Sequence, residues 1–205
     1  MAGTTARRPL RADARRNYER ILAAAQQAFA AHGADASLEG IARQAGVGSA
    51  TLHRHFPSRR ALLDAVFHDR VEALCARAQE HARASEPGAA LFSWLRDFNA
   101  YAAASRGLVG SLLRDGRDTD LLQEDDDCKM MITTAADELL QQAQQAGAAR
   151  PGIRTEDLLA LVSAISLAAE DHDDDAQAGR LLDIAIEGLR PHRCEHPTST
   201  RETFS

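Results

Sequence analysis

Residues 46–56 of the chain read GVGSATLHRHF, a stretch with two glycines, two histidines and an arginine but no acidic side chain. Gly46 permits a sharp turn, because a residue without a β-carbon adopts left-handed backbone angles at little cost. A short helix is expected to follow over residues 49–55. Pro57 disfavours a helical conformation at Phe56 and marks the end of that helix. The stretch therefore predicts a tight turn that leads into a short helix with polar and basic side chains.

Apolar residues on both sides of this stretch recur at the three- and four-residue spacing of α-helices. Ser37 can cap a short helix that ends at the glycine turn, and Ser58 can cap a long helix that extends to about residue 84. An earlier helix is expected over residues 14–31. Two short helices joined by a glycine turn form a helix-turn-helix, a module that places its second helix in the major groove of DNA. The residues expected to face inward are Tyr18, Ile21, Leu22, Ala25, Phe29, Leu38, Ile41, Ala42, Ala45, Leu52, Phe56, Leu62, Leu63, Val66, Phe67, Val71 and Leu74.

The rest of the chain also reads as helix, because strand patterns are nearly absent. The segments SEPG at 85–88 and GAARPG at 147–152 are expected breaks. The tail from residue 191 has the composition of a disordered segment. The sequence predicts an all-α fold. Its remaining helices are expected over residues 89–105, 108–113, 127–146, 155–170 and 176–189.

The formal net charge of the chain is -6, and it is unevenly distributed. Residues 1–60 contain ten arginines and four acidic residues, a net charge of +6, so residues 61–205 carry -12. A basic segment on an acidic body suggests that only the first segment meets a polyanion. Five arginines before residue 17 could form an arm that reaches a minor groove or phosphates, although a loose basic tail without specific contacts is an equal alternative.

Several functional classes are excluded or disfavoured by the sequence. No apolar run approaches the ~18 residues of a membrane span, and no signal-peptide segment follows the first arginines, so we expect a cytoplasmic protein without membrane contact. Cys75, Cys128 and Cys194 are widely spaced, which argues for reduced thiols and against a structural zinc site. The acidic runs at 123–128 and 171–175 are more typical of solvated helix ends than of a metal site. No catalytic motif is present, and we expect neither enzymatic activity nor a metal or other cofactor.

The segment SLEGIARQAGVGSATLHRHFPSRRALLDAV, residues 37–66, resembles the amino-terminal domain of the TetR family of transcriptional repressors. The segment LFSWLRDFNAYAAASRGLVGSLLRDG, residues 91–116, resembles the SbtR-like branch of the family's carboxy-terminal domains. The resemblance implies an N-terminal three-helix DNA-binding domain with a helix-turn-helix and a larger C-terminal helical domain that binds an effector and dimerises. The expected divisions are a flexible basic arm at 1–14, the DNA-binding domain at 15–60, the effector-binding and dimerisation domain at 61–190 and a disordered tail at 191–205.

The resemblance also implies roles for single residues at the DNA. Ala50 and Thr51 would read base edges at the start of the recognition helix, and Arg59 would meet the phosphate backbone where the family usually has a lysine. Ser37 would donate to a phosphate. The chain departs from the family pattern at Gly48, in place of a serine cap, and at His53 and His55, which stand where the family often has tyrosines that touch phosphate. Histidines there would make the strength of the phosphate contacts depend on pH. The full set of expected DNA-binding residues is Ser37, Ser49, Ala50, Thr51, His53, Arg54, His55 and Arg59. The alternative is that these polar side chains are only the solvated face of a small helix.

The family's last two long helices pair with those of a second copy, and the sequence permits such a homodimer. The segments 155–170 and 176–189 are apolar around much of their circumference, and such helices need cover on more than one side. A dimer would also place two recognition helices ~34 Å apart, one turn of a near-palindromic DNA duplex. The alternative is that both helices are buried inside a monomer.

Aromatic residues are concentrated in one segment. Trp94, Phe98 and Tyr101 share a helix face and could line a pocket for an unknown small-molecule effector, with Met131 and Thr134 contributing. Ordinary core packing explains the aromatic residues equally well. The sequence as a whole predicts a dimeric repressor that a small molecule releases from double-stranded DNA. A nonspecific or architectural DNA-binding protein is the alternative, and an enzyme is a remote one.

Overall fold

The computed structural model of the chain describes residues 7–33, 36–114, 126–170 and 175–191. Within these ranges the backbone forms helices and no strands, which confirms the all-α prediction. None of the helices in the described ranges combines the length and the apolar character needed to cross a membrane. The helices are α1 (Arg7–His32), α2 (Leu38–Gln44), α3 (Ser49–His55), α4 (Arg59–Ala84), α5 (Pro87–Arg114), α6 (Asp126–Gln145), α7 (Thr155–Glu170) and α8 (Asp175–Leu189).

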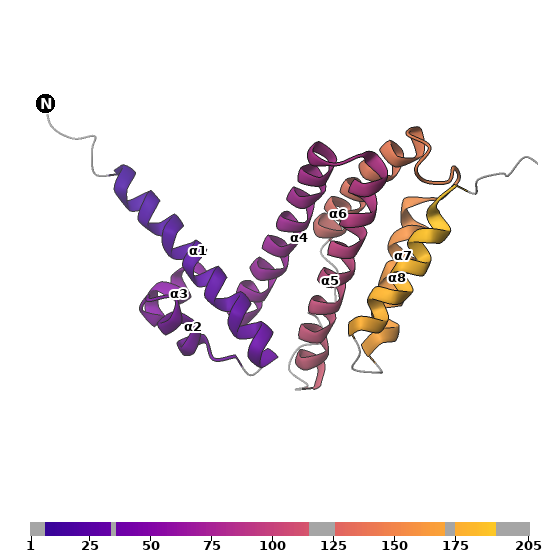
Figure 1. The fold of residues 1–205 in the computed structure, drawn as a ribbon. Helices are drawn as coiled ribbons and strands as arrows, with labels where there is room; N and C mark the ends of the chain where they lie inside the picture. The colour runs from indigo at the N-terminus through magenta and orange to yellow at the C-terminus, as the bar shows by residue number, and fades with distance from the viewer. Residues whose placement is uncertain (1–6, 34–35, 115–125, 171–174, 192–205) are drawn as a thin grey trace, which may run out of the picture.

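The helices form two groups that α4 connects. Helices α1, α2 and α3 gather at one end of the molecule, α5 and α6 lie along the far part of α4, and α7 and α8 lie side by side next to α5 (Figure 1). Helix α4 contacts both α1 and α5, so it belongs to both groups. The two groups are therefore linked mainly through α4, with a smaller direct contact between α1 and α5.

Each group has its own apolar core. The N-terminal core, formed by α1–α3 and the first part of α4, extends to Val66. The C-terminal core begins on α4 at Leu74 and includes the fully buried Trp94 of α5. Most residues expected to face inward are buried, but Tyr18 is 38% exposed, and Leu38 and Phe67 are half-buried.

Local signals account for the starts of α2 and α4. The Ser37 hydroxyl accepts a hydrogen bond from the Gly40 amide at 3.3 Å and caps α2, and the Ser58 hydroxyl accepts one from the Ala61 amide at 3.1 Å and caps α4. Both caps were expected from the sequence. The bounds of α2, α3 and α4 agree with the prediction within about one or two residues.

Two helices differ from the prediction. Helix α1 begins at Arg7 and not near residue 14, because Pro9 is tolerated in a first turn whose amides have no partner within the helix, and arginine and alanine favour helix. The separate helices expected over 89–105 and 108–113 are a single helix, α5, which continues through Gly107. An isolated glycine costs a helix only about 1 kcal/mol, which a long packed helix tolerates.

Candidate nucleic-acid interface

The turn between α2 and α3 is built around Gly46. Its φ is +63°, in the left-handed region that glycine adopts most easily. The Val47 amide donates to the Ala42 carbonyl at 2.9 Å and fixes the path of the chain after α2. Leu52 and Phe56 are buried and attach α3 to the N-terminal core. The structure therefore contains the two helices and the tight turn that the sequence predicts.

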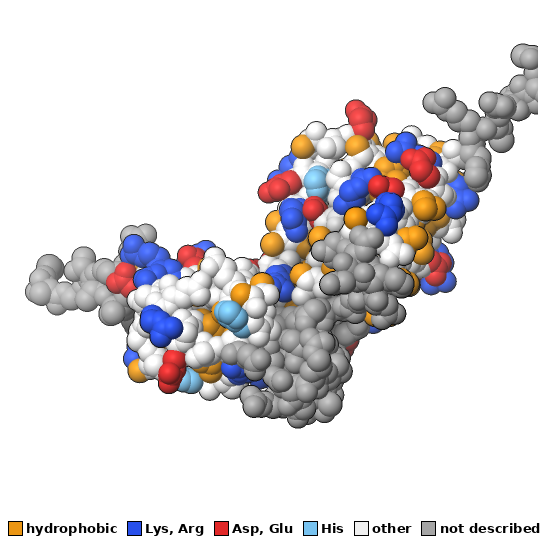
Figure 2. Space-filling view, turned by 60° about the horizontal axis from the view of Figure 1, so that its bottom comes forward, with side chains coloured by type: hydrophobic (Ala, Val, Ile, Leu, Met, Phe, Trp, Pro, Cys, Tyr) orange, Lys and Arg blue, Asp and Glu red, His pale blue; other side chains and the backbone are white. Residues whose placement is uncertain are grey.

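The outer side of α3 carries the expected base-reading and basic residues. Ser49, Ala50, His53 and Arg54 are exposed, and Thr51 is half-buried. Figure 2 shows arginine and histidine side chains on one face of the N-terminal group. With Leu52 facing inward and these side chains facing outward, α3 has the free polar face that a helix needs in a DNA groove.

His55 is placed differently from its neighbours. It is half-buried, and its ring lies edge-on to Tyr18 of α1, with ring centroids 6.2 Å apart. Tyr18 also packs against Phe56, with centroids 5.0 Å apart. The sequence indicated Tyr18 only as a core residue, but its ring connects α1 to the end of α3. Nothing in one sequence pairs two rings that are 37 positions apart.

Two arginines hold the loops that flank α2. The Arg20 guanidinium of α1 donates to the Gly46 carbonyl at 3.2 Å, and the Arg59 guanidinium of α4 donates to the Ala36 carbonyl at 2.6 Å. The role of Arg20 was not predicted, because no local motif marks an arginine for a carbonyl in a later turn. Arg59, predicted at a phosphate, lies half-buried at the start of α4 and holds the segment before α2. Ser37 lies exposed at the first turn of α2, and its hydroxyl proton is available for a phosphate because the oxygen only accepts from Gly40.

The aromatic residues predicted to line an effector pocket lie in the C-terminal core. Trp94 is fully buried and donates through Nε1 to the Leu74 carbonyl at 3.1 Å. Its ring stacks on Phe98 with centroids 5.6 Å apart, and Phe98 in turn stacks on Tyr101 at 6.3 Å. Tyr101 and Met131 are half-buried and Thr134 is exposed.

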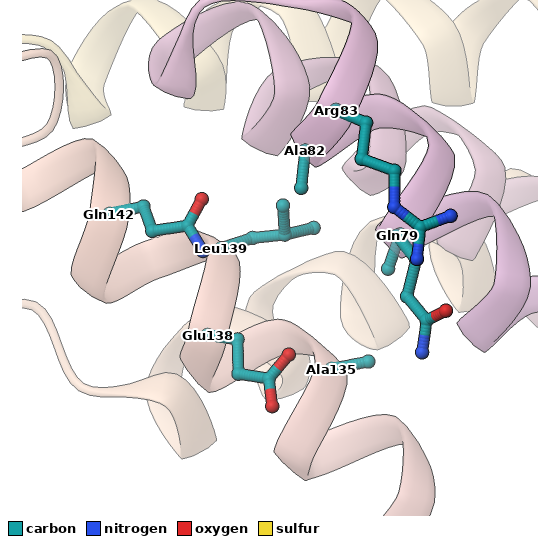
Figure 3. Close-up of a pocket in the computed structure, with 8 residues that line it drawn as sticks. Gln79, Ala82, Arg83, Ala135, Glu138, Leu139 and Gln142 are labelled. Carbon is teal, nitrogen blue, oxygen red and sulfur yellow. The ribbon is translucent and has the colours of Figure 1, made fainter.

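A surface hollow of about 200 Å³ lies elsewhere, between α4 and α6. In Figure 3, Arg83 and Gln79 approach it from α4, and Glu138 and Gln142 approach it from α6. None of the five residues predicted for the effector pocket lines this hollow. Its volume is below the ~300 Å³ that a typical small-molecule pocket reaches.

The acidic run at 171–175 was expected to be solvated and not to bind a metal, and most of it lies outside the described residues. Among the residues that the structure describes, no group of three or more histidine, cysteine, aspartate or glutamate side chains is arranged to hold a metal ion.

Comparison with known proteins identifies the two groups of helices. Residues 21–66 match the model of the bacterial regulatory proteins of the tetR family, and residues 86–191 match the model of the C-terminal domain of SbtR-like transcriptional regulators. No curated protein sequence matches the chain.

Solved structures agree with both matches. A TetR transcriptional regulator from Streptomyces coelicolor is 39% identical, with a TM-score of 0.73 over 86% of this chain and 99% of that one. A TetR regulatory protein from Mycobacterium vanbaalenii is 37% identical, with a TM-score of 0.71 over 89% of this chain and 100% of that one. The transcriptional regulator FadR from Bacillus subtilis, solved in complex with stearoyl-CoA, shares the fold at 18% identity and a TM-score of 0.61 over 84% of this chain and 100% of that one.

The resemblance inferred from residues 37–66 and 91–116 is thereby confirmed for both parts of the chain. The protein belongs to the TetR family and is a DNA-binding transcriptional regulator, not an enzyme.

Proposed function

We propose that this regulator is a homodimeric repressor that acts in the cytoplasm and leaves its operator when a small molecule binds the C-terminal helices. The observation that supports the dimer most directly is an exposed apolar surface on the last two helices. Leu161 and Leu167 of α7 are 43% and 57% exposed, and Ile184 of α8 is 70% exposed.

These side chains lie on helices whose other faces are already packed. Leu158 and Val162 of α7 and Leu182 and Ile186 of α8 are buried in the C-terminal core. A helix that is apolar on its outer face as well needs a second surface to cover it. Burial of both helices within one subunit, the alternative considered from the sequence, leaves Ile184 without cover. A second copy of the same pair of helices provides it in an isologous contact.

A dimer would position the N-terminal helices of both subunits to bind DNA together. Two copies of α3 about 34 Å apart would enter successive major grooves on one side of a near-palindromic site. Thr51 and the exposed residues of α3 would read base edges, while Ser37, Arg54 and Arg59 would meet phosphates. We keep the division into a DNA-binding domain at 15–60 and an effector and dimerisation domain at 61–190 as part of this proposal.

Release by a small molecule requires that the ligand bind better to a conformation with different spacing of the two α3 helices. We place the ligand beside Trp94, Phe98 and Tyr101, with Met131 and Thr134 at its edge. Tyr101 gives this stack a polar end, because an aromatic ring with a hydroxyl tip can orient an amphipathic ligand.

The test combines oligomeric state with DNA selection. Light scattering on the purified protein is expected to give the mass of a dimer, and selection from genomic fragments is expected to yield a palindrome bound ~10³ times or more tightly than random duplex. Equal affinity for random and selected duplexes would favour the nonspecific DNA-binding alternative and contradict a repressor.

An Ile184→Glu variant tests the dimer surface. It is expected to be monomeric and to bind the palindrome weakly, because a carboxylate cannot be buried without a partner. Met130→Glu is the matched control: Met130 is also an exposed large apolar residue, at 62%, but it lies on α6. A dimeric Ile184→Glu protein, or equal disruption by both substitutions, would contradict the assignment of α7 and α8 as the interface.

A further inference from the structure

A thiol, an imidazole and a carboxylate form a chain of contacts between α4 and α6. The Cys128 sulfur lies 3.6 Å from Nδ1 of His68, and Nε2 of the same ring lies 3.4 Å from Oε1 of Glu72. His68 and Glu72 are one turn apart on α4, whereas Cys128 comes from the first turn of α6, 60 positions later in the chain. The packing of two helices therefore creates the arrangement.

The three groups have the order of a nucleophile, a base and a group that orients the base. In the tautomer whose proton lies on Nε2, on the side of Glu72, Nδ1 of His68 has a free lone pair toward the thiol and can accept its proton. The thiolate that results is the reactive form of cysteine. Both His68 and Cys128 are half-buried, so a small molecule reaches them while the chain stays folded.

Cys75, on the same helix as His68, has different surroundings. Burial raises the pKa of the Cys75 thiol, and the negative charge of Glu72 raises it further. Cys75 is therefore held as a thiol at neutral pH and provides an internal comparison for Cys128.

A hydrogen-bond donor, the Tyr101 phenol, lies near this group. Burial raises the pKa of the Tyr101 phenol, against smaller opposing effects of the Ser105 hydroxyl and the Arg70 guanidinium, and Cys128 lies close enough to contribute to the rise. The phenol thus keeps its proton at neutral pH. Arg70 lies close enough to Tyr101 to lower the pKa of its phenol. The Tyr101 hydroxyl suits an oxygen that gains negative charge beside the sulfur.

We propose that Cys128, with His68 as its base, is a covalent binding site for a small α,β-unsaturated carbonyl compound. The Cys128 thiol gives its proton to Nδ1 of His68, and the sulfur forms a bond to the β-carbon of the compound. The π electrons of the carbon–carbon double bond move toward the carbonyl oxygen, which becomes an enolate oxygen that the Tyr101 hydroxyl stabilises. The proton held by His68 then goes to the α-carbon. The product is a thioether, and the addition needs no oxidant, reductant or other co-reactant.

The place of the adduct on α4 connects it to DNA binding, and this part rests on the repressor function proposed above. Asp69, next to His68, accepts a hydrogen bond from Gln26 of α1 at 2.6 Å. A group attached between α4 and α6 at this level would press on the segment of α4 that holds α1, and so change the placement of α3.

The experiment treats the full-length protein with trans-2-hexenal at pH 7 and follows adduct formation by intact mass and peptide mapping. We expect one adduct per chain, at Cys128, formed about tenfold faster than at Cys75, because an unassisted thiol is only a few per cent thiolate at this pH. His68→Asn should slow the reaction at Cys128 about tenfold or more, as expected for loss of a general base. Cys128→Ser should abolish this adduct, and Cys75→Ser should leave its rate unchanged.

Two results would overturn the proposal: first modification at Cys75 or Cys194, or a His68→Asn protein that reacts at the wild-type rate. Circular dichroism melting of each variant separates a lost base from a lost fold, since a variant with a wild-type melting curve and a slowed rate supports the role of His68.

Gel-shift titration of the adduct on the selected palindrome is a separate readout. If the unmodified protein selects no palindrome, the repressor function fails while the mass result still decides the site. If the adduct binds the palindrome as the free protein does, the link to DNA release is wrong.

Discussion

Replacement of Gly46 by alanine tests the reason for the glycine in the helix-turn-helix. The φ of +63° costs a residue with a β-carbon about 1–2 kcal/mol relative to glycine. The new β-carbon would also collide with Nη2 of Arg20, closer than real β-carbons approach other atoms. The guanidinium must move, and its hydrogen bond to the Gly46 carbonyl is lost or stretched.

The backbone cost at residue 46 and the loss of the Arg20 hydrogen bond arise from different interactions, so we add the two free energies. The Arg20 bond is exposed, so we assign it only about 0.5–1 kcal/mol. Gly46→Ala should therefore lower the free energy of unfolding by about 1.5–3 kcal/mol, which for a chain of this length lowers the melting temperature by roughly 3–12 °C. Thermal unfolding followed by circular dichroism measures the change.

Gly48→Ala is the matched control two residues later. Its φ is -73°, and no atom lies within 4 Å of the position that a β-carbon would take there, so the substitution loses only the modest preference of a helix cap for glycine over alanine. An Arg20→Ala background separates the two effects, because Gly46→Ala should cost about 0.5–1 kcal/mol less when the guanidinium is absent. Equal melting temperatures for the Gly46→Ala and Gly48→Ala proteins would refute the need for glycine at position 46. If Gly46→Ala lowers the free energy of unfolding by the same amount with and without Arg20, the proposed collision with Arg20 is wrong.

The remaining predictions concern the DNA interface. Thr51→Ala is expected to relax the base preference measured by fragment selection while the melting temperature stays within about 2 °C, as for most single changes outside the core; an unchanged preference would count against base reading. Arg59→Ala is expected to weaken all duplexes alike and to flatten the salt dependence by about one unit. It should also destabilise the fold by about 1–2 kcal/mol, because the Ala36 carbonyl loses its donor. If the Arg59→Ala protein is less stable but its DNA affinity keeps the wild-type salt dependence, Arg59 has a structural role and does not contact phosphate.

Local signals made the helix-turn-helix predictable from the sequence. The Ser37 and Ser58 caps, the glycine turn and Pro57 each act within four residues, so their effects can be read from neighbouring positions. The periodicity of α7 and α8 likewise indicated apolar character on more than one face, and the exposure of Ile184 agrees with it.

The contacts that position α3 could not be predicted in the same way. Arg20 and Gly46 are 26 positions apart, and Arg59 and Ala36 are 23 apart, so each pair meets only after the helices have packed. The same holds for the approach of Cys128 to His68. The expected interruption between residues 105 and 108 was wrong, because packing of α5 against its neighbours outweighs the low helix propensity of Gly107.

Helix α4 provides the main route by which a change in one group of helices can reach the other. Its first half contributes Leu62, Leu63 and Val66 to the N-terminal core, and its second half contributes Leu74 and Ala78 to the C-terminal core. A continuous helix transmits displacement along its length, because each turn is hydrogen-bonded to the next. Packed cores resist gradual deformation, so a ligand that alters packing beside the second half favours a shift of the whole helix. Because Arg59 and Asp69 on α4 contact Ala36 and Gln26 respectively, such a shift acts on the segment before α2 and on α1.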